Sequence, residues 1–354
     1  MKPVHYVMWQ IGPGGLELVV KQYSEYFYQH RKLYAYGLRP NWYQIYDESK
    51  VEVAAGNSGK LRPYWQYYRY CRKYRDDIFH LQSVGPLILL LHLLAGGKNV
   101  IYHIHGTIYW KSALQKIYLG AGWRWVKRLL PKVKATFVAN SKYSASIFRE
   151  KVLPVPTEVI YNGFDVQKFA AKKHLRTSVK RIGYAGRLWE GKNTELLIRL
   201  FEEVADQHPE LELHFAGEGP LKEALEQQAQ ATRFADRIFF HGYLKDIPSF
   251  YASLDIFLFL SAHESFGNVI AEALLTGLPT LTSDVPVFEE IFGQGNGFVL
   301  GSPQQYDLIK KNFLKAIDNF PHLAQAALEI SDSIEAQCSI ENHLKQIEKV
   351  YEKH

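Results

Sequence analysis

The segment that decides the fold spans residues 263–274 and reads His-Glu-Ser-Phe-Gly-Asn-Val-Ile-Ala-Glu-Ala-Leu. It follows the apolar run Ile256–Leu260, which predicts a buried strand, and its Gly-Asn pair predicts the start of a helix. Glu264 and Glu272 are eight residues apart, a little over two helical turns, so both carboxylates can lie on roughly one side of the helix start. The segment therefore predicts a strand that leads directly into a helix.

This arrangement suits a ligand that is both phosphorylated and rich in hydroxyl groups. A helix N-terminus offers free N–H groups and the positive end of the helix dipole, which favour an anionic phosphate. Carboxylates bind phosphate poorly but accept hydrogen bonds from hydroxyls. A nucleotide-sugar has both kinds of group. The alternative is one solvated surface carboxylate and one helix-cap acid, because surface helices often carry such pairs.

The rest of the chain alternates predicted strands and helices, which is the pattern of parallel sheets. Strands are predicted at residues 4–9, 78–81, 100–104, 135–139, 159–160, 181–185, 211–216, 238–240, 256–260 and 280–282. Residues 168–174 are predicted to be a linker and residues 340–352 a terminal helix. The length of 354 residues is enough for two domains with a core each. We expect two doubly wound α/β domains that bind ligands at the carboxyl ends of their strands.

Two cations follow the predicted strand of residues 181–185. Arg187 and Lys192 are five residues apart on a loop that leads into a helix, so they can straddle one diphosphate, Arg as a fork and Lys as a point charge. Two solvated surface cations are the alternative. The position at the ligand-binding end of a sheet favours the diphosphate.

Two more strand ends carry candidate residues in the first half. Gly14 and Gly15 lie in the first strand-to-helix turn, where the absence of a Cβ lets the backbone approach a diphosphate; a tight turn without a ligand is the alternative. His105 follows the predicted strand of residues 100–104, with His103 on the same face, so the strand can also bury both as core residues. A metal site is disfavoured because no Cys or acidic cluster accompanies them.

Residues 263–279 resemble the paired-glutamate signature of the retaining glycosyltransferases of family 4, which have the two-domain GT-B fold. The family pattern is a Glu, Gly or Ser, Phe, Gly, a short apolar stretch and a second Glu followed by Ala, with a Gly-x-Pro turn beyond it. The chain departs from it at Asn268, where a larger apolar residue is common. The resemblance implies two Rossmann-like domains that face a central cleft. The acceptor-side domain would span residues 1–168 and the donor domain residues 179–335, while the helix of residues 336–354 can cross back to the first domain.

The resemblance also implies roles for single residues. Arg187, Lys192, Glu264 and His105 are the expected catalytic residues. Gly14, Gly15, Gly186, Gly219, Phe266, Gly267, Asn268 and Glu272 are the expected donor contacts. Glu264 would accept hydrogen bonds from sugar hydroxyls, Glu272 from ribose hydroxyls, and His105 would contact the sugar or a phosphate. The cation pair stands in for a metal in this family, and no Asp-x-Asp sequence occurs, so we expect no metal and no other cofactor.

Charge divides the chain. Residues 1–165 carry 23 basic and 10 acidic residues, against 19 and 26 in the remainder. Basic residues alternate with aromatic ones in Lys60–Arg75 and Trp110–Lys134, a mixture that an anionic membrane surface attracts. Nucleic acid would use the same chemistry, and a solvated basic face with aromatic residues packed inward is the third interpretation. We expect the Lys60–Lys134 region to contact an anionic membrane surface and no nucleic acid.

The resemblance implies a retaining, metal-independent hexosyltransferase. It would move a sugar from a nucleotide-diphosphate donor to a hydroxyl of a glycan or polyprenyl-linked saccharide, in cell-surface polysaccharide or lipopolysaccharide biosynthesis. The alternatives are a nucleotide-sugar epimerase or hydrolase of the same fold, and a non-catalytic binder of anionic polymers. The longest apolar run, Leu87–Ala95, is too short to span a membrane, and the N-terminus does not resemble a signal peptide. We expect a cytoplasmic protein, with peripheral binding to the inner face of the membrane as an option.

Overall fold

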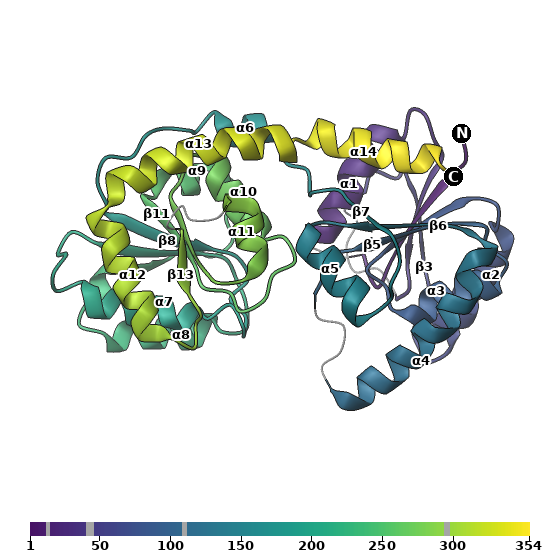
Figure 1. Cartoon of the computed structure of the whole chain (residues 1–354), viewed down its shortest axis with the longest axis horizontal. Helices are drawn as coiled ribbons and strands as arrows, with labels where there is room; N and C mark the ends of the chain where they lie inside the picture. Colours follow the sequence, from purple (N-terminus) through teal and green to yellow (C-terminus); the bar gives the residue numbers. More distant parts are fainter. Residues whose placement is uncertain (12–14, 40–45, 108–111, 294–297) are drawn as a thin grey trace. The chain divides into compact units, whose positions relative to one another are not determined.

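The computed structural model describes residues 1–11, 15–39, 46–107, 112–293 and 298–354. The chain forms two compact units (Figure 1). Unit 1 consists of Met1–Gly163 together with Glu341–His354, and unit 2 of Phe164–Ile340. Each unit has its own parallel sheet and its own core.

Unit 1 contains a sheet of seven parallel strands in the order β3-β2-β1-β4-β5-β6-β7. The strands are β1 (Val4–Met8), β2 (Leu33–Gly37), β3 (Glu52–Ala55), β4 (Ile78–Gln82), β5 (Asn99–Ile104), β6 (Lys134–Ala139) and β7 (Thr157–Val159). The order reverses at β1, so the predicted doubly wound sheet is confirmed. Because the strands are parallel, their carboxyl ends share one edge of the sheet.

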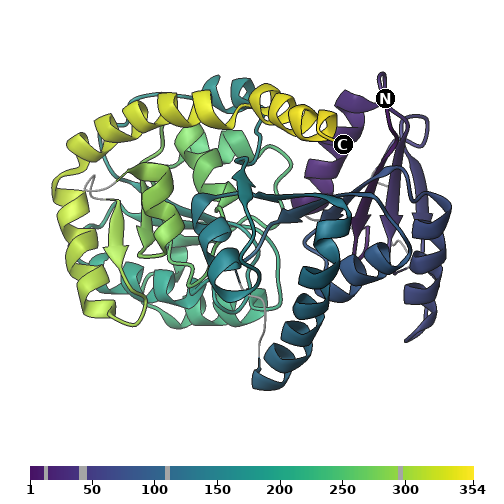
Figure 2. The ribbon, with the colours of Figure 1, turned by 45° about the vertical axis from the view of Figure 1, so that its right-hand side comes forward.

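Helices cover both faces of this sheet. They are α1 (Gly15–Phe27), α2 (Arg62–Lys73), α3 (Pro86–Leu94), α4 (Ala113–Leu129), the 3₁₀ turn η1 (Leu130–Lys132), α5 (Lys142–Lys151) and α14 (Ile340–Glu352). Buried side chains of α2, α3, α4 and α5 share one hydrophobic core with the strands, for example Tyr67, Ile88, Trp123 and Phe148. On the other face α14 lies beside α1, where Phe27 meets the edge of the Tyr351 ring (Figure 1, Figure 2).

Unit 2 contains a sheet of six parallel strands in the order β10-β9-β8-β11-β12-β13. The strands are β8 (Arg181–Ala185), β9 (Glu212–Ala216), β10 (Ile238–Phe240), β11 (Ile256–Phe259), β12 (Thr280–Ser283) and β13 (Val299–Gly301). The helices are α6 (Val166–Ala170), α7 (Thr194–Val204), α8 (Lys222–Ala231), η2 (Ala235–Arg237), α9 (Ile247–Ser253), α10 (Asn268–Leu275), α11 (Pro286–Phe292), α12 (Tyr306–Asp318) and α13 (Phe320–Cys338). The reversal at β8 confirms a second doubly wound sheet.

The structure divides the chain at other residues than the sequence predicted. The predicted first domain ended at residue 168, and the predicted second domain spanned residues 179–335. The chain passes between the units after Gly163 and again after Ile340. The predicted linker of residues 168–174 is wrong at its start, because α6 forms there, packs against α10 and buries Val166 and Phe169. Asp165 caps this helix by accepting a hydrogen bond from the Lys168 N–H.

Candidate active site

The carboxyl ends of β8 and β11 bring two predicted loops together. The two strands pair directly, so residues far apart in the sequence become neighbours. The Lys192 ammonium donates to Glu264 Oε1 and forms an ion pair with it. The loops are joined at two more points, where the Ala262 N–H donates to the Gly191 carbonyl at 2.9 Å and the Asn193 amide donates to the Leu260 carbonyl at 2.7 Å. The pairing fixes the ammonium and the carboxylate at this edge of the sheet.

The Lys192–Glu264 pair is only partly exposed. The side chains are 26 and 15 % exposed, and the ammonium also lies 5.3 Å from the centre of the Phe259 ring. A carboxylate has about four acceptor sites and an ammonium three donors. Both groups can therefore bind a ligand with their remaining sites while the ion pair orients them.

Arg187 lies on the same loop but is exposed. Its guanidinium carbon is 4.5 Å from the centre of the exposed Trp189 ring. A buried side chain of β8 fixes the loop backbone, because the Tyr184 hydroxyl donates to the Arg187 carbonyl at 3.0 Å. The arrangement holds the loop in place and leaves the guanidinium at the surface, where an anion can reach it.

Glycines allow the turns after β8 and β9 to pack backbone against backbone. A Cβ at Gly217 would lie 1.9 Å from the Gly186 carbonyl oxygen, and one at Gly219 would lie 2.1 Å from the Leu188 oxygen. Gly186 also has a φ of +142°, which a side chain would disfavour. The close packing requires glycine at 217 and 219, and the positive φ favours it at 186, while the contacts of Gly186 and Gly219 with a donor stay predictions.

Helix α10 begins where the Gly-Asn pair predicts it. Gly267 has a φ of +86°, and its Cβ would lie 3.2 Å from Phe288 and 3.3 Å from Ile270, so only glycine fits without strain. Asn268 is the first helical residue. The Phe266 ring is buried and stacks on Phe164 with ring centres 6.2 Å apart, so this side chain packs into the core.

Glu272 lies in the second turn of α10 and is held by Tyr251 of α9. The Tyr251 hydroxyl donates to Glu272 Oε2 at 3.0 Å. Burial raises the pKa of Glu272 to about 7, and the hydrogen bond from Tyr251 and the positive charge of Lys168 only partly oppose this. Near neutral pH the carboxyl group therefore exchanges between a neutral form, which can donate, and an ionised form, which only accepts.

His105 lies at the carboxyl edge of unit 1. Its backbone N–H donates to Ser83 Oγ at 2.7 Å, and its Nε2 is 2.7 Å from Gln82 Oε1. The ring stacks on His103 with centres 4.0 Å apart. Burial lowers the pKa of His105 to about 3, with a smaller contribution from His343, so the ring is neutral at physiological pH. His103 is fully buried, as a core residue should be, and contacts His80.

The remaining predicted positions are less informative. Gly14 lies outside the described residues, and Gly15 is the first residue of α1. Within the described ranges, no group of three or more His, Cys, Asp or Glu side chains could hold a metal ion.

Two family models match the chain in succession. The model described as Glycosyltransferase Family 4 matches residues 14–168, and the model described as Glycosyl transferases group 1 matches residues 165–327. The chain is a glycosyltransferase of the family 4 type.

Several proteins resemble this glycosyltransferase. The lipopolysaccharide core biosynthesis mannosyltransferase LpsB of Rhizobium meliloti is 27% identical over 75% of this chain and 76% of its own length. The O-antigen biosynthesis glycosyltransferase WclY of Escherichia coli is 28% identical over 62% of this chain, which spans 64% of WclY. The crystal structure of Anabaena HepE in complex with UDP covers 99% of this chain and all of HepE, with a TM-score of 0.79 and 18% identity, and it shares the GT-B fold.

The basic aromatic region of the glycosyltransferase divides into two parts. In α2 the aromatic residues pack inward: Tyr67 is fully buried, and Tyr64, Tyr68, Tyr70 and Tyr74 lie against the core. Leu61 and Trp65 at the start of α2 are exposed, and membrane contact of this helix stays a prediction. In α4, Ile117, Tyr118 and Trp125 are each more than half exposed, while Trp123 is buried. Of these two helices, α4 exposes more apolar side chains beside its cations.

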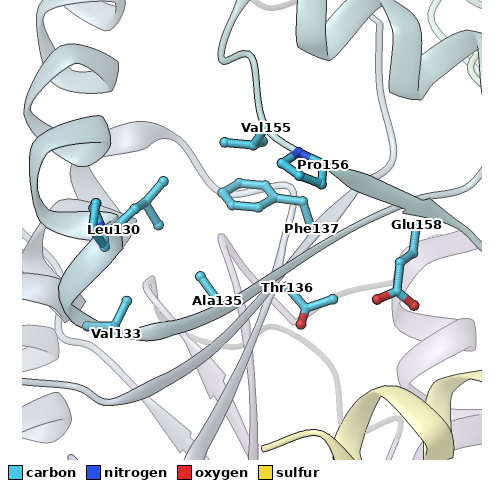
Figure 3. A pocket seen from close by; sticks show the side chains of 9 residues that line it. Leu130, Val133, Ala135, Thr136, Phe137, Val155, Pro156 and Glu158 are labelled. Atoms are coloured by element: carbon cyan, nitrogen blue, oxygen red, sulfur yellow. The ribbon is translucent and has the colours of Figure 1, made fainter.

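An apolar pocket lies at the opposite end of the unit 1 sheet from His105. Its volume is about 340 Å³, and it is lined by Leu130, Pro131, Val133, Ala135, Thr136, Phe137, Val155, Pro156 and Glu158. Phe137, Val155 and Pro156 form one wall (Figure 3). Glu158 is the one charged side chain of the lining, and it pairs with Lys353 at 2.6 Å. Apart from Glu158 and Thr136, the lining is apolar.

The sequence did not identify four residues that hold the site of this glycosyltransferase. Gln82 and Ser83 end β4 and hold His105, Asn193 joins the two loops, and Tyr251 binds Glu272. Because ligands bind at the carboxyl ends of parallel strands, inspection of the residues at the end of β4 would have identified Gln82 and Ser83. Asn193 ends the motif that carries Arg187 and Lys192, but its partner could not be predicted, and no sequence signal points to Tyr251, because only the fold brings these partners near.

Proposed function

We propose that this glycosyltransferase moves a hexose from a nucleotide-diphosphate donor to a hydroxyl of a glycan or polyprenyl-linked saccharide, in the assembly of a cell-surface polysaccharide or lipopolysaccharide. One observation carries the proposal: the loops after β8 and β11 hold Lys192 against Glu264, on the loop that also carries Arg187, at the strand ends where doubly wound sheets bind ligands. The similarity to LpsB and WclY supports the pathway. HepE, whose crystal structure contains UDP, supports a nucleotide donor.

The charges suggest how unit 2 acts on the donor. Cleavage of the anomeric C–O bond leaves negative charge on the departing diphosphate and an oxocarbenium-like centre on the sugar. Arg187, Lys192 and the N-terminal end of α10 stabilise the diphosphate, and no metal ion is required. A diphosphate carries more negative charge than a single carboxylate, so it competes with Glu264 for Lys192. Glu264 keeps acceptor sites for the sugar hydroxyls.

The reaction proceeds with retention of the anomeric configuration. The acceptor hydroxyl attacks the same face of the sugar from which the diphosphate departs. The departing phosphate oxygen takes the proton of that hydroxyl, so no side chain acts as a general base. Glu272 accepts hydrogen bonds from the ribose hydroxyls in its ionised form. This contact favours ionisation, so donor binding lowers the pKa of Glu272.

The acceptor arrives on an anionic membrane surface that α4 contacts. The exposed Ile117, Tyr118 and Trp125 lie among Arg124, Lys127 and Arg128, and the Arg128 guanidinium lies 5.1 Å from the centre of the Trp125 ring. No acidic residue occurs between Ile78 and Arg149. The first turns of α4 extend beyond α3 and α5 (Figure 1, Figure 2). None of the described helices is long and apolar enough to cross a bilayer, and surface contact needs none.

Liposome flotation tests this contact. The protein should float with vesicles that contain an anionic lipid and stay behind with neutral ones. Trp125→Ala should reduce binding about tenfold, since it removes the largest exposed aromatic side chain of α4. Trp65→Ala on α2 is the matched control and should change little. Equal loss in both variants, or no binding to anionic vesicles, would exclude α4 as the contact.

A panel of nucleotide-sugars tests the reaction. We would measure thermal stabilisation and slow hydrolysis with a chelator present, for the wild type, Arg187→Ala and Glu272→Ala. One donor should stabilise the wild type and neither variant. A response that needs a metal ion would overturn the metal-independent mechanism, and an isomerised or hydrolysed product at full rate without an acceptor would identify an epimerase or a hydrolase.

A further inference from the structure

Two arginines among the described residues are buried, and their surroundings differ. Arg176 in unit 2 is 3% exposed, and Arg31 in unit 1, which follows α1, is 7% exposed. Neither forms an ion pair with an acidic side chain of the described residues. A buried guanidinium without a carboxylate needs other partners, because the burial of an unpaired charge is costly.

Arg176 finds its partners among backbone carbonyls. Its Nε donates to the Leu254 carbonyl at 2.6 Å, and its Nη2 donates to the Tyr251 carbonyl at 3.1 Å. Its Nη1 donates to three further carbonyl oxygens at 2.9 to 3.2 Å. All three guanidinium nitrogens are therefore hydrogen-bonded, as expected for an arginine with a structural role.

Arg31 has far fewer contacts. Its Nη1 donates to the Lys2 carbonyl at 3.3 Å, and its Cζ lies 5.4 Å from the centre of the buried Tyr351 ring. Its Nε is enclosed and has no hydrogen-bond partner in the part of the chain that the structure describes. Its Nη2 has no partner among those residues either, but it is not enclosed. One long hydrogen bond and one ring contact leave most donors of Arg31 unused.

Arg31 lines a mostly polar pocket of about 500 Å³ in unit 1, together with Lys32 and Lys50. The pocket lies at the start of two strands, since Arg31 and Lys32 precede β2 and Lys50 precedes β3. The strands are parallel, so this is the amino edge of the sheet, whereas His105 follows the carboxyl end of β5. The pocket is therefore separate from the candidate active-site residue of unit 1.

The charges of the pocket leave Arg31 as its unpaired cation. The lining contains three cations and two carboxylates, Glu48 and Glu52. Both lysines pair with acidic side chains at 3.5 Å. Within the described ranges, Arg31 is the cation of this lining that has no such partner. An anion in the pocket would supply the acceptors that the guanidinium lacks.

We propose that this pocket binds the phosphate group of a soluble phosphorylated sugar, at a place separate from the residues proposed to bind the donor. The planar fork of a guanidinium matches two oxygens of a phosphate, and the Nη2 of Arg31 is the donor that still reaches the pocket. A pocket of this volume holds a small molecule rather than a bare ion. The carboxylates of Glu48 and Glu52 accept hydrogen bonds from hydroxyls, so the ligand is a phosphate monoester with a hydroxyl-rich body.

The first test compares stability with and without phosphate. About 10 mM inorganic phosphate should raise the unfolding temperature of the wild type by roughly 2 °C, because a ligand that binds only the folded state stabilises it. Arg31→Met removes the unpaired charge, so it should lose this shift and should unfold no lower than the wild type in phosphate-free buffer. Arg176→Met is the matched control and should unfold at a lower temperature, because five carbonyls lose their donor.

The second test measures binding by isothermal titration calorimetry. Glucose 6-phosphate should bind to the wild type and glucose should not, and Arg31→Met should weaken the binding of glucose 6-phosphate at least about tenfold. Arg31→Lys keeps the charge but loses the fork, so it should bind with intermediate affinity. Arg187→Ala should leave this binding unchanged, since Arg187 belongs to the proposed donor site in unit 2.

Each part of the proposal can fail separately. A phosphate shift that Arg31→Met retains would be a general effect of salt and would overturn the site. Binding of glucose 6-phosphate that depends on Arg187 and not on Arg31 would assign the ligand to the donor site instead. An unfolding temperature lowered as much in Arg31→Met as in Arg176→Met would make Arg31 a structural residue. Binding to vesicles with phosphatidic acid that depends on Arg31, without binding of glucose 6-phosphate, would replace the soluble sugar by a lipid headgroup.

Discussion

The candidate residues of the two units are held by different kinds of interaction. In unit 2, Lys192 and Glu264 form a partly exposed ion pair, and Arg187 lies at the surface. In unit 1, His105 is neutral and rests on buried rings joined by uncharged hydrogen bonds. The difference supports the proposal that unit 2 binds an anion, and it shows that unit 1 holds a neutral ring in one orientation. Variants in the two units should therefore fail in different ways.

The largest effect should come from the anion-binding side. Lys192→Ala should lower kcat/KM for the donor roughly 10²–10³-fold, because it removes a charge that stabilises the departing diphosphate. The loss should appear in steady-state kinetics with little change in the temperature of unfolding. Arg199→Ala on α7 removes another cation of unit 2, which pairs with Glu203, and should leave activity unchanged. A loss below tenfold in Lys192→Ala would contradict the role given to unit 2.

Backbone packing should give the next largest effect. Gly219→Ala places a Cβ 2.1 Å from the Leu188 carbonyl oxygen, so the turn must shift and the free energy of unfolding should fall by roughly 2–4 kcal/mol. Gly120→Ala is the matched control in unit 1, because nothing lies within 4 Å of its Cβ on α4 and alanine favours a helix. Urea unfolding measures both. Equal stability of the two variants would show that the turns of unit 2 do not need glycine.

Glu272 should make the stability of unit 2 depend on pH. Its pKa of about 7 in the fold is above its ordinary value of 4.5. Its contribution is therefore fully present below pH 4.5 and is lost as pH rises through 7, by roughly 1–3 kcal/mol. Urea unfolding at pH 5 and pH 8 should show a smaller decrease in Glu272→Gln than in the wild type.

Glu203 provides a control of opposite sign for this measurement. Hydrogen bonds from Lys310 and Arg199, together with the charge of Lys310, hold its pKa below the ordinary value. Its contribution is present above the unfolded pKa and is lost in acid, so Glu203→Gln should not reduce the decrease between pH 5 and pH 8. If the free energy of unfolding falls as much between pH 5 and pH 8 in Glu272→Gln as in the wild type, another group causes the pH dependence.

The smallest effect on activity should come from the buried contacts of His103, His80 and Tyr351 in unit 1. Tyr351→Phe removes the hydroxyl that contacts His80 and leaves a buried nitrogen without its partner, which should cost about 1–2 kcal/mol of unfolding free energy. Activity should change less than in Lys192→Ala, because the His105 ring keeps its contacts with Gln82 and His103. A loss of activity as large as that of Lys192→Ala would make the network part of the chemistry and erase the contrast between the units.

Much of the fold followed from local sequence. Arg181–Ala185, Ile238–Phe240 and the helix Ile340–Glu352 were predicted with the bounds that the structure shows, because apolar runs between turn residues define strands and period 3.6 defines helices. Strands β2, β3 and β13 were not identified. β3 is a four-residue strand, Glu-Val-Ala-Ala, at the edge of its sheet, and alanine and glutamate give little strand signal.

The candidate site was predicted in its residues but not in its contacts. The sequence by itself determined which strand ends carry Arg187, Lys192, Glu264 and His105, since each lies in the loop that follows an apolar strand. Only the tertiary structure decided that Lys192 meets Glu264, that Gln82 meets His105 and that the tyrosines of α2 face inward. The physical reason is that the order of strands in a sheet sets these partners. That order results from the packing of whole elements, which no local pattern of residues records.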